Sequence, residues 1–149
     1  MGRKGVSEVM EANTGQSHSL QQERFKKQPI LGIGFRMGAM ILTEVGDFSR
    51  FASPDKLLAY AGMSPSTYQF GQLKNCHSHM EKRGSRYLRY ALYNVAKYVC
   101  LWDPAFAAYL AKKRAEDKHY NVALSHAAKK LVRLIFALEK SGRPYCPAA

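Results

Sequence analysis

The chain has 149 residues, of which 46% are hydrophobic and 23% charged, a composition typical of one globular domain rather than of a disordered or fibrous protein. Lys and Arg number 23 against 11 Asp and Glu, so the net charge is +12, and 15 of the basic but only 5 of the acidic residues follow Gly71. The chain has no apolar run long enough for a membrane span and no signal-peptide core at its N-terminus, so we expect a cytoplasmic protein, not a membrane protein, that binds a polyanion.

The start of the chain combines a polar segment with a glycine turn. The first 28 residues are polar and aperiodic, which predicts a flexible leader before a single domain over residues 29–149. Gly32 and Gly34 then stand directly before an apolar helix expected over residues 35–44. Because glycine allows positive φ and close approach, such a turn can present helix N-terminal N–H groups to a phosphate. This is the logic of a helix-hairpin-helix element, although an ordinary tight turn has the same pattern.

Capping signals delimit the next helices. Ser53 and Pro54 begin a short helix that ends before Gly62. Residues 63–84 break the periodicity and predict an irregular loop or short hairpin, and loops of this length in a compact domain are commonly functional. Ser85 then caps a long helix, whose predicted core-facing stripe consists of Leu88, Ala91, Leu92, Val95, Ala96 and Val99.

Two further helices complete the prediction. Asp103 and Pro104 begin a helix that runs to about Glu116, and Asn121 is expected to cap a last helix that Gly142 ends. The expected fold class is all-α, with a helix-hairpin-helix element, a helical bundle, and an irregular loop or short hairpin between them.

The long helix carries a basic face opposite its apolar stripe. Arg86, Arg89 and Lys97 recur there at helical spacing, and tyrosines such as Tyr90 and Tyr93 lie among them. Cationic side chains neutralise phosphates, while tyrosines lie along a backbone or stack on bases. A solvated surface helix is the alternative, but the local charge excess and the glycine turn favour a nucleic-acid interface. The predicted contacts to DNA are Gly32, Gly34, Lys74, Lys82, Arg83, Arg86, Arg89 and Lys97.

No metal site is expected. Cys76, His77 and His79 are zinc-ligand types close in sequence, but a tetrahedral site needs a fourth ligand, and the carboxylates are few and dispersed. With Cys100 and Cys146 the cysteines are three in number and widely spaced, which indicates reduced thiols rather than a disulfide framework.

Several sequence blocks occur in a characteristic order and spacing. They are the Gly-x-Gly turn with EVGDFSRF, then SPDKLLAYAGMSPSTYQFG, then KRGSRYLRYALYNVAK followed by HYNVALSHAAKKLVRLIFALEKSGRPY. From about Ile30 to Ala149, the chain closely resembles the C-terminal domain of bacterial insertion-sequence transposases that have an N-terminal DEDD (RuvC-like) domain. That family includes the Piv DNA invertase.

The resemblance implies a DNA recombinase. In the family, carboxylates of the acidic domain bind Mg²⁺, a serine in a Tyr-Gln-Ser-Gly-like segment is the proposed nucleophile on DNA, and an element-encoded guide RNA takes part. Here the segment reads Tyr68-Gln69-Phe70-Gly71, so Phe70, which has no hydroxyl, occupies the nucleophile position. Ser66 is the nearby fallback, and the residues before Ile30 leave no room for the acidic domain.

We therefore expect a truncated family member that binds DNA, is catalytically incompetent by itself in DNA cleavage and joining, and needs no cofactor as this fragment. Besides DNA, the candidate partners are a guide RNA and a full-length transposase or a second copy of this chain, and no membrane is involved. The alternatives are a stand-alone nucleic-acid-binding module that regulates the full-length transposase, and an RNA-binding protein without a role in recombination.

Overall fold

The computed structural model describes residues 30, 32–65, 69–70, 73–74 and 79–147, so the predicted leader over residues 1–28 lies outside the described part. Within that part the elements are the α-helices α2 (Phe35–Val45), α3 (Pro54–Tyr60), α4 (Arg86–Trp102), α5 (Pro104–Ala115) and α6 (Tyr120–Ser141), the 3₁₀ helix η1 (Phe48–Arg50), and the antiparallel strands β1 (Gln69–Phe70) and β2 (Leu73–Lys74). The all-α prediction is confirmed, and a short hairpin lies where a loop or hairpin was expected.

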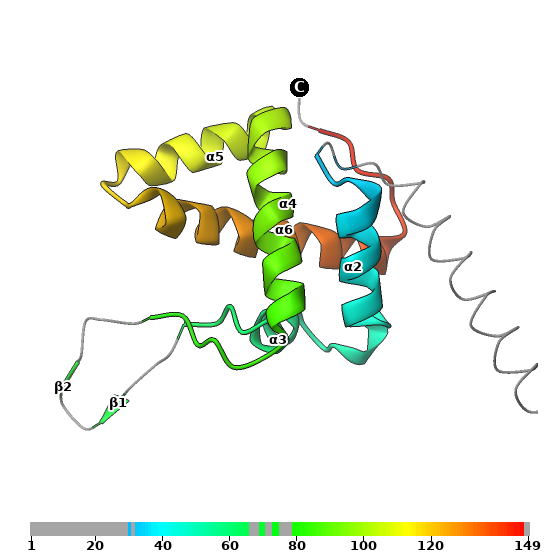
Figure 1. The fold of residues 1–149 in the computed structure, drawn as a ribbon, viewed down its shortest axis with the longest axis horizontal. Helices are drawn as coiled ribbons and strands as arrows, with labels where there is room; N and C mark the ends of the chain where they lie inside the picture. The colour runs from blue at the N-terminus through cyan, green and yellow to red at the C-terminus, as the bar shows by residue number, and fades with distance from the viewer. Residues whose placement is uncertain (1–29, 31, 66–68, 71–72, 75–78, 148–149) are drawn as a thin grey trace, which may run out of the picture.

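Helix α4 lies at the centre of the fold. It packs against α2, α5 and α6, and it stands upright in front of α6 in Figure 1. Helix α6 also packs against α3, α5 and η1, while the hairpin of β1 and β2 projects away from the helices. This arrangement buries one face of α4 and leaves another on the surface.

The long helices are amphipathic, so each contributes one face to a shared core. The stripe predicted for α4 is buried, and Leu88, Val95 and Val99 have no exposed surface. They belong to one hydrophobic cluster with residues of the neighbouring helices, including Ile41 and Leu131. Burial of this apolar surface is the main favourable contribution to folding. None of the described helices has the length and apolar character needed to cross a bilayer.

Three predicted helix starts are confirmed by side-chain caps. The Ser53 hydroxyl accepts a hydrogen bond from the Lys56 N–H at 3.4 Å, and the Ser85 hydroxyl accepts one from the Leu88 N–H at 3.1 Å. The Asp103 carboxylate caps α5 by accepting from two N–H groups of its first turn, at 2.8 and 3.4 Å. Each cap satisfies a donor that would otherwise have no partner within its helix.

The predicted start of the last helix is wrong. Helix α6 begins at Tyr120, and its N-cap is His119 rather than Asn121. The His119 Nδ1 accepts a hydrogen bond from the Asn121 N–H at 3.3 Å, so a ring nitrogen takes the place of the usual side-chain oxygen. The predicted end of the helix is confirmed, because Gly142 is its C-cap with φ 64° and donates to the Leu138 carbonyl at 2.8 Å.

The segment after α6 returns to the junction of α4 and α5. There the Tyr145 hydroxyl donates a hydrogen bond to the fully buried Asp103 carboxylate. Burial and the contact with Asp103 raise the pKa of Tyr145 to about 12, so its hydroxyl stays protonated at neutral pH. The Asp103 carboxylate thus joins the cap of α5 to the C-terminal segment.

Candidate nucleic-acid interface

A groove of about 520 Å³ lies along the exposed side of α4. We call it the α4 groove; its lining residues are Met80, Lys82, Arg86, Arg89, Tyr90, Tyr93, Asn94, Lys97, Asn121 and Leu124. It contains four of the eight residues predicted to contact DNA, namely Lys82, Arg86, Arg89 and Lys97. No carboxylate is present among these lining residues, so the groove is positively charged.

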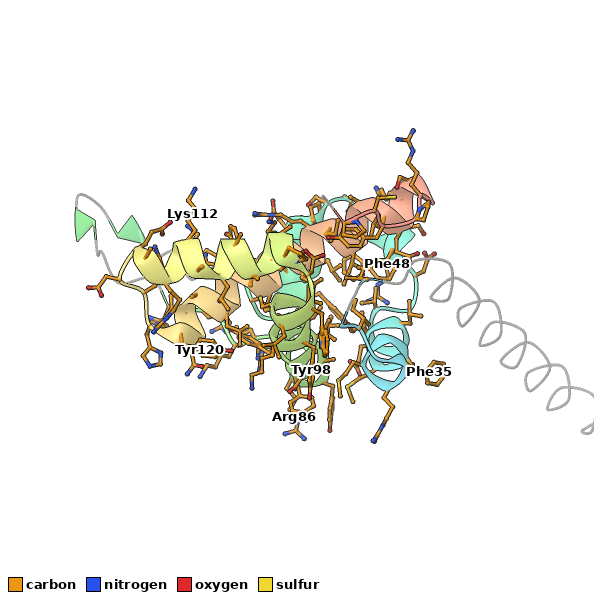
Figure 2. All side chains as sticks on the ribbon, turned by 90° about the horizontal axis from the view of Figure 1, so that it is seen from above. Phe35, Phe48, Arg86, Tyr98, Lys112 and Tyr120 are labelled. Carbon is orange, nitrogen blue, oxygen red and sulfur yellow. The ribbon has the colours of Figure 1, made fainter. Side chains whose placement is uncertain are left out.

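The outer edge of the groove combines exposed cations with exposed aromatic rings. Figure 2 shows Arg86 and Tyr98 of α4 projecting from the same side of the molecule as Tyr120, at the start of α6. The Arg86 guanidinium carbon lies 5.0 Å from the centre of the Tyr87 ring, and its Nη2 donates to the Tyr87 hydroxyl at 3.0 Å. These contacts restrict the Arg86 side chain without removing it from solvent, since both residues are exposed.

Arg89 differs from the exposed arginine that the helical spacing suggested. It is half-buried, and its Nη1 donates to the Ala61 carbonyl at 3.2 Å and to the Lys82 carbonyl at 3.3 Å. The end of α3 lies close enough for this because the Ser85 N–H donates to the Tyr60 carbonyl at 2.9 Å. Arg89 therefore fixes the wall of the groove as well as contributing charge to it.

The close contact of α3 with the start of α4 depends on Gly84. This residue has φ 137°, and a Cβ atom there would lie 2.3 Å from the Tyr60 carbonyl oxygen, well inside contact distance. Only glycine fits this position without a backbone shift. The position of Lys82, which precedes α4, is set by the same contact.

The floor of the groove is less polar than its edge. Tyr93 is half-buried, and its hydroxyl contacts the Met80 Sδ at 3.7 Å. Burial raises the pKa of Tyr93, so the phenol remains neutral and keeps its hydrogen as a donor. A neutral ring below a rim of cations is suited to the sugar and base parts of a nucleic acid.

The predicted glycine turn lies beside the C-terminal half of α4. Gly32 has φ 99°, and a Cβ atom there would lie 2.7 Å from the Tyr98 carbonyl carbon, so packing against α4 requires this glycine. Gly34 is the exposed N-cap of α2 with φ −69°, and no side chain caps that helix. The turn thus leaves the N-terminus of α2 open to solvent, while half-buried Ile33 packs on the core.

Of the other predicted site residues, Arg83 is exposed in the segment before α4 but is not part of the lining. Lys74 belongs to β2, and its side chain lies outside the described part of the chain. Phe70 belongs to β1, although its side chain, like all of Ser66, lies outside the described part of the chain. The nucleophile position is therefore placed only as part of the hairpin.

The cysteine and histidines of zinc-ligand type lie mostly outside the described part of the chain. Cys76 and His77 lie outside the described residues, and His79 is exposed. In the described ranges no group of three His, Cys, Asp or Glu residues could hold a metal ion. Cys100 is buried and Cys146 is exposed, and neither forms a disulfide within the described residues.

The sequence analysis missed a second basic groove, of about 610 Å³, on α6. We call it the α6 groove; its lining residues are Asp55, Leu58, Met63, Ser64, Pro65, Tyr109, His126, Lys129, Lys130 and Arg133. The signal that could have revealed it is the i, i+3, i+4, i+7 spacing of its four basic residues, which places them on one side of a helix.

Residues 28–111 match the model of the transposase family IS116/IS110/IS902. The chain is 32% identical over 116 residues to the insertion element IS110 uncharacterized 43.6 kDa protein of Streptomyces coelicolor, covering 76% of this chain and 28% of that protein. It is 28% identical over 153 residues to the insertion element IS900 uncharacterized 42 kDa protein of Mycobacterium paratuberculosis, covering 96% of this chain and 38% of that protein.

A third relative has a more informative name. The chain is 29% identical over 117 residues to the pilin gene-inverting protein of Moraxella bovis, covering 78% of this chain and 36% of that protein. Across these three relatives the chain spans 28% to 38% of their length. The similarity is therefore to one part of longer proteins.

Proposed function

This chain belongs to the IS116/IS110/IS902 transposase family, and on that premise we propose that it binds DNA through the α4 groove as part of the machinery that moves an insertion sequence. The observation that carries the proposal is the convergence of Lys82, Arg86, Arg89 and Lys97 in one groove without a carboxylate in its lining. Contacts to phosphates supply most of the affinity of such proteins for DNA.

The groove is preorganised for phosphate binding. Tyr87 restricts the Arg86 guanidinium, and two backbone carbonyls hold the Arg89 guanidinium, so less side-chain freedom is lost when an anion arrives. An arginine fork can also form two parallel hydrogen bonds to one phosphate, which a lysine cannot do. The exposed Tyr90 ring supplies a flat surface for a sugar or an unpaired base.

A further phosphate contact is proposed at the start of α2. Gly34 and Arg36 are exposed there, and the N–H groups of the first turn have no side-chain cap. A helix N-terminus carries a partial positive charge and orphan donors, which suit an anion. Since α2 packs beside α4, the same duplex can reach both places.

For DNA cleavage, we propose that this chain is incompetent by itself, because Phe70 occupies the position of the proposed nucleophile and has no hydroxyl group. A guide RNA and a full-length family protein are the further partners that the resemblance implies. Mg²⁺ would belong to the acidic domain of a complete member.

The DNA-binding proposal is tested by fluorescence anisotropy with a labelled duplex over a range of salt concentrations. Arg86→Ala/Lys97→Ala removes two exposed cations of the α4 groove, and Lys112→Ala/Arg143→Ala is a matched control, because it removes the same residue types at exposed positions outside both grooves. Lys112 projects from the opposite side of the molecule in Figure 2.

Each phosphate contact contributes about 0.9 to the slope of log K against log salt, so we expect the α4 pair to reduce the slope by about 1.8 and the control pair to leave it unchanged. Equal slopes for both pairs would refute the α4 groove as the binding surface. Tighter binding of a matched RNA than of DNA would favour the RNA-binding alternative.

A further inference from the structure

The two grooves lie on opposite faces of α6. At about 100° per residue, the α6 residues of the α6 groove centre roughly 160° away from Asn121 and Leu124, which line the α4 groove. The α6 groove is completed by α3, α5 and Met63, Ser64 and Pro65 after α3, whereas Met80 and Lys82, further along the same connection, line the α4 groove. A bridge between Pro65 and Met80 lies between the two grooves, and they share no lining residue, so a ligand in one groove leaves the other accessible.

The α6 groove has a strong excess of positive charge. Lys129, Lys130 and Arg133 are cationic, whereas Asp55 is the one carboxylate among its lining residues. Asp55 pairs with Arg133 at 3.3 Å, and both side chains of that pair are exposed, so the ion pair is weak and exchangeable. Among the ion pairs of the described residues, none involves Lys129 or Lys130.

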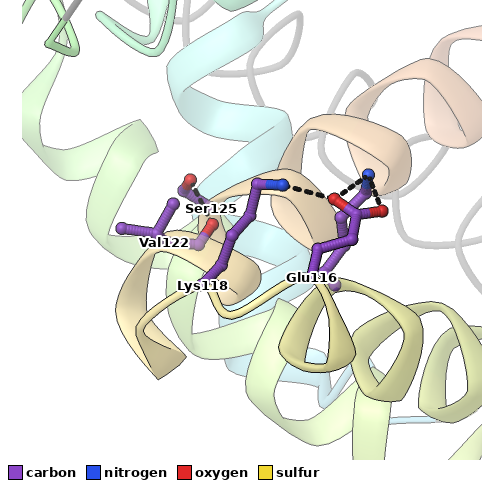
Figure 3. Close-up of polar contacts among 5 residues, drawn as sticks. Glu116, Lys118, Val122 and Ser125 are labelled. Atoms are coloured by element: carbon purple, nitrogen blue, oxygen red, sulfur yellow. Dashed lines mark hydrogen bonds and ion pairs between the residues drawn. The ribbon is translucent and has the colours of Figure 1, made fainter. Parts of the chain in front are cut away.

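Two lysines near the groove but outside it, Lys113 and Lys118, differ from Lys129 and Lys130 because each already forms an ion pair with a carboxylate. Figure 3 shows Glu116 accepting a hydrogen bond from Lys118 in the turn between α5 and α6. The same carboxylate accepts from the Lys113 Nζ of α5 at 2.8 Å. These two contacts lower the pKa of Glu116 to about 2, so the pairing persists at any physiological pH. Lys129 and Lys130, in contrast, take part in none of the ion pairs of the described residues and are available to an external anion.

Two of these cations are held in place. The Lys130 Nζ lies 5.0 Å from the centre of the Phe106 ring and 4.6 Å from that of Tyr109, two cation–π contacts that position it on the groove wall. Lys129 is half-buried, and its pKa is lowered first by burial and then by the nearby charge of Arg133.

We propose that the α6 groove binds the phosphates of a second nucleic-acid segment, so that this domain holds two backbones at once, one on each side of α6. The three cations lie within residues 129–133, about 6 Å of helix, which matches about two phosphates of one strand at 3.4 Å of duplex axis each. Exposed Pro65 supplies an apolar contact for the sugars, and the core residues Leu58 and Met63 lie behind the groove. The simultaneous binding of two segments rests on the proposed function of the α4 groove, whereas the second site itself does not.

The test counts duplexes per chain. Analytical ultracentrifugation of the full chain with a duplex of about 10 base pairs, too short to reach around the domain, measures the stoichiometry at saturation and the oligomeric state in one experiment. The variants are Lys129→Ala/Arg133→Ala for the α6 groove, Arg86→Ala/Lys97→Ala for the α4 groove and Lys112→Ala/Arg143→Ala as control. Each removes one lysine and one arginine. If the alanine pair in α6 lowers the thermal midpoint, Lys129→Gln/Arg133→Gln replaces it, since glutamine keeps part of the side-chain length.

We expect two duplexes per chain for the wild type and the control, and one for either groove variant. One duplex per chain for the wild type, unchanged by the α6 variant, would overturn the inference and leave the α4 proposal intact. If only the α6 variant binds one duplex fewer than the wild type, the result would support the α6 groove as a binding site and refute the α4 groove as a DNA-binding surface. Binding of a polyglutamate peptide that the α6 variant loses, while its duplex stoichiometry stays at two, would assign the groove to an acidic protein partner and also overturn the inference.

Discussion

At the scale of single residues, Arg86 and Arg89 show how similar positions on one helix acquire different roles. Both stand on the basic face that the helical spacing predicted, three residues apart. Arg86 is exposed and contacts a neighbouring tyrosine, whereas Arg89 is half-buried and donates to two backbone carbonyls. The difference arises because the end of α3 packs beside the start of α4. Helical spacing within α4 cannot reveal this contact with another element.

These environments predict different costs in stability. We expect Arg89→Ala to lower the free energy of unfolding by about 1–2 kcal/mol, because hydrogen bonds from a charged group to two backbone carbonyls, one of them part-buried, are lost. Arg86→Ala should change it by less than about 0.5 kcal/mol, as exposed substitutions usually do. Urea denaturation followed by circular dichroism measures both. Equal midpoints for the two variants would show that the Arg89 contacts do not stabilise the fold.

At the scale of elements, the starts of α3, α4 and α5 were predictable because a cap is a local interaction. Ser53, Ser85 and Asp103 each bond an N–H group two or three residues further along. The start of α6 was not predicted, because His119 is an uncommon cap and Asn121 matched the usual pattern better. The contact of Tyr145 with Asp103 could not be predicted from local sequence patterns, since the two residues are 42 positions apart in the sequence.

The contact between Tyr145 and Asp103 predicts a loss of stability at high pH. The pKa of Tyr145 is about 12 in the folded protein and about 10 in an unfolded chain, so its contribution is complete below pH 10 and is lost between pH 10 and 12. In urea titrations we expect the wild type to exceed Tyr145→Phe in stability by a constant margin at neutral pH, and this margin to shrink above pH 10. A margin that stays constant to pH 11.5 would contradict the pairing.

At the scale of the whole molecule, the helical domain carries the two grooves for which binding is proposed, whereas the proposed nucleophile position belongs to the hairpin that projects from it (Figure 1). We expect Phe70→Ser to be insufficient for DNA cleavage in the presence of Mg²⁺. The resemblance to the family implies that the metal-binding carboxylates belong to a separate acidic domain, and the described ranges hold no group of three His, Cys, Asp or Glu residues that could hold a metal ion.

The check is incubation with labelled DNA followed by denaturing electrophoresis. Neither the wild type nor Phe70→Ser should form a covalent adduct, whereas Phe70→Ser fused to a family DEDD domain, with its RNA supplied, is the form expected to recover strand transfer. An adduct of the wild type that Ser66→Ala abolishes would show that the nucleophile lies elsewhere in the segment.

The sequence by itself determined the helices, the buried stripe of α4, the basic surplus after Gly71 and the resemblance to the family, because each depends on local spacing or on residue type. Tertiary structure alone decided which cations share a groove. Lys82 joins Arg86 only because Gly84 lets α3 approach α4, and the α6 groove exists only where α3 and α5 wall in the basic side of α6. A phosphate site is a convergence of side chains from distant segments, and the packing of the helices determines that convergence.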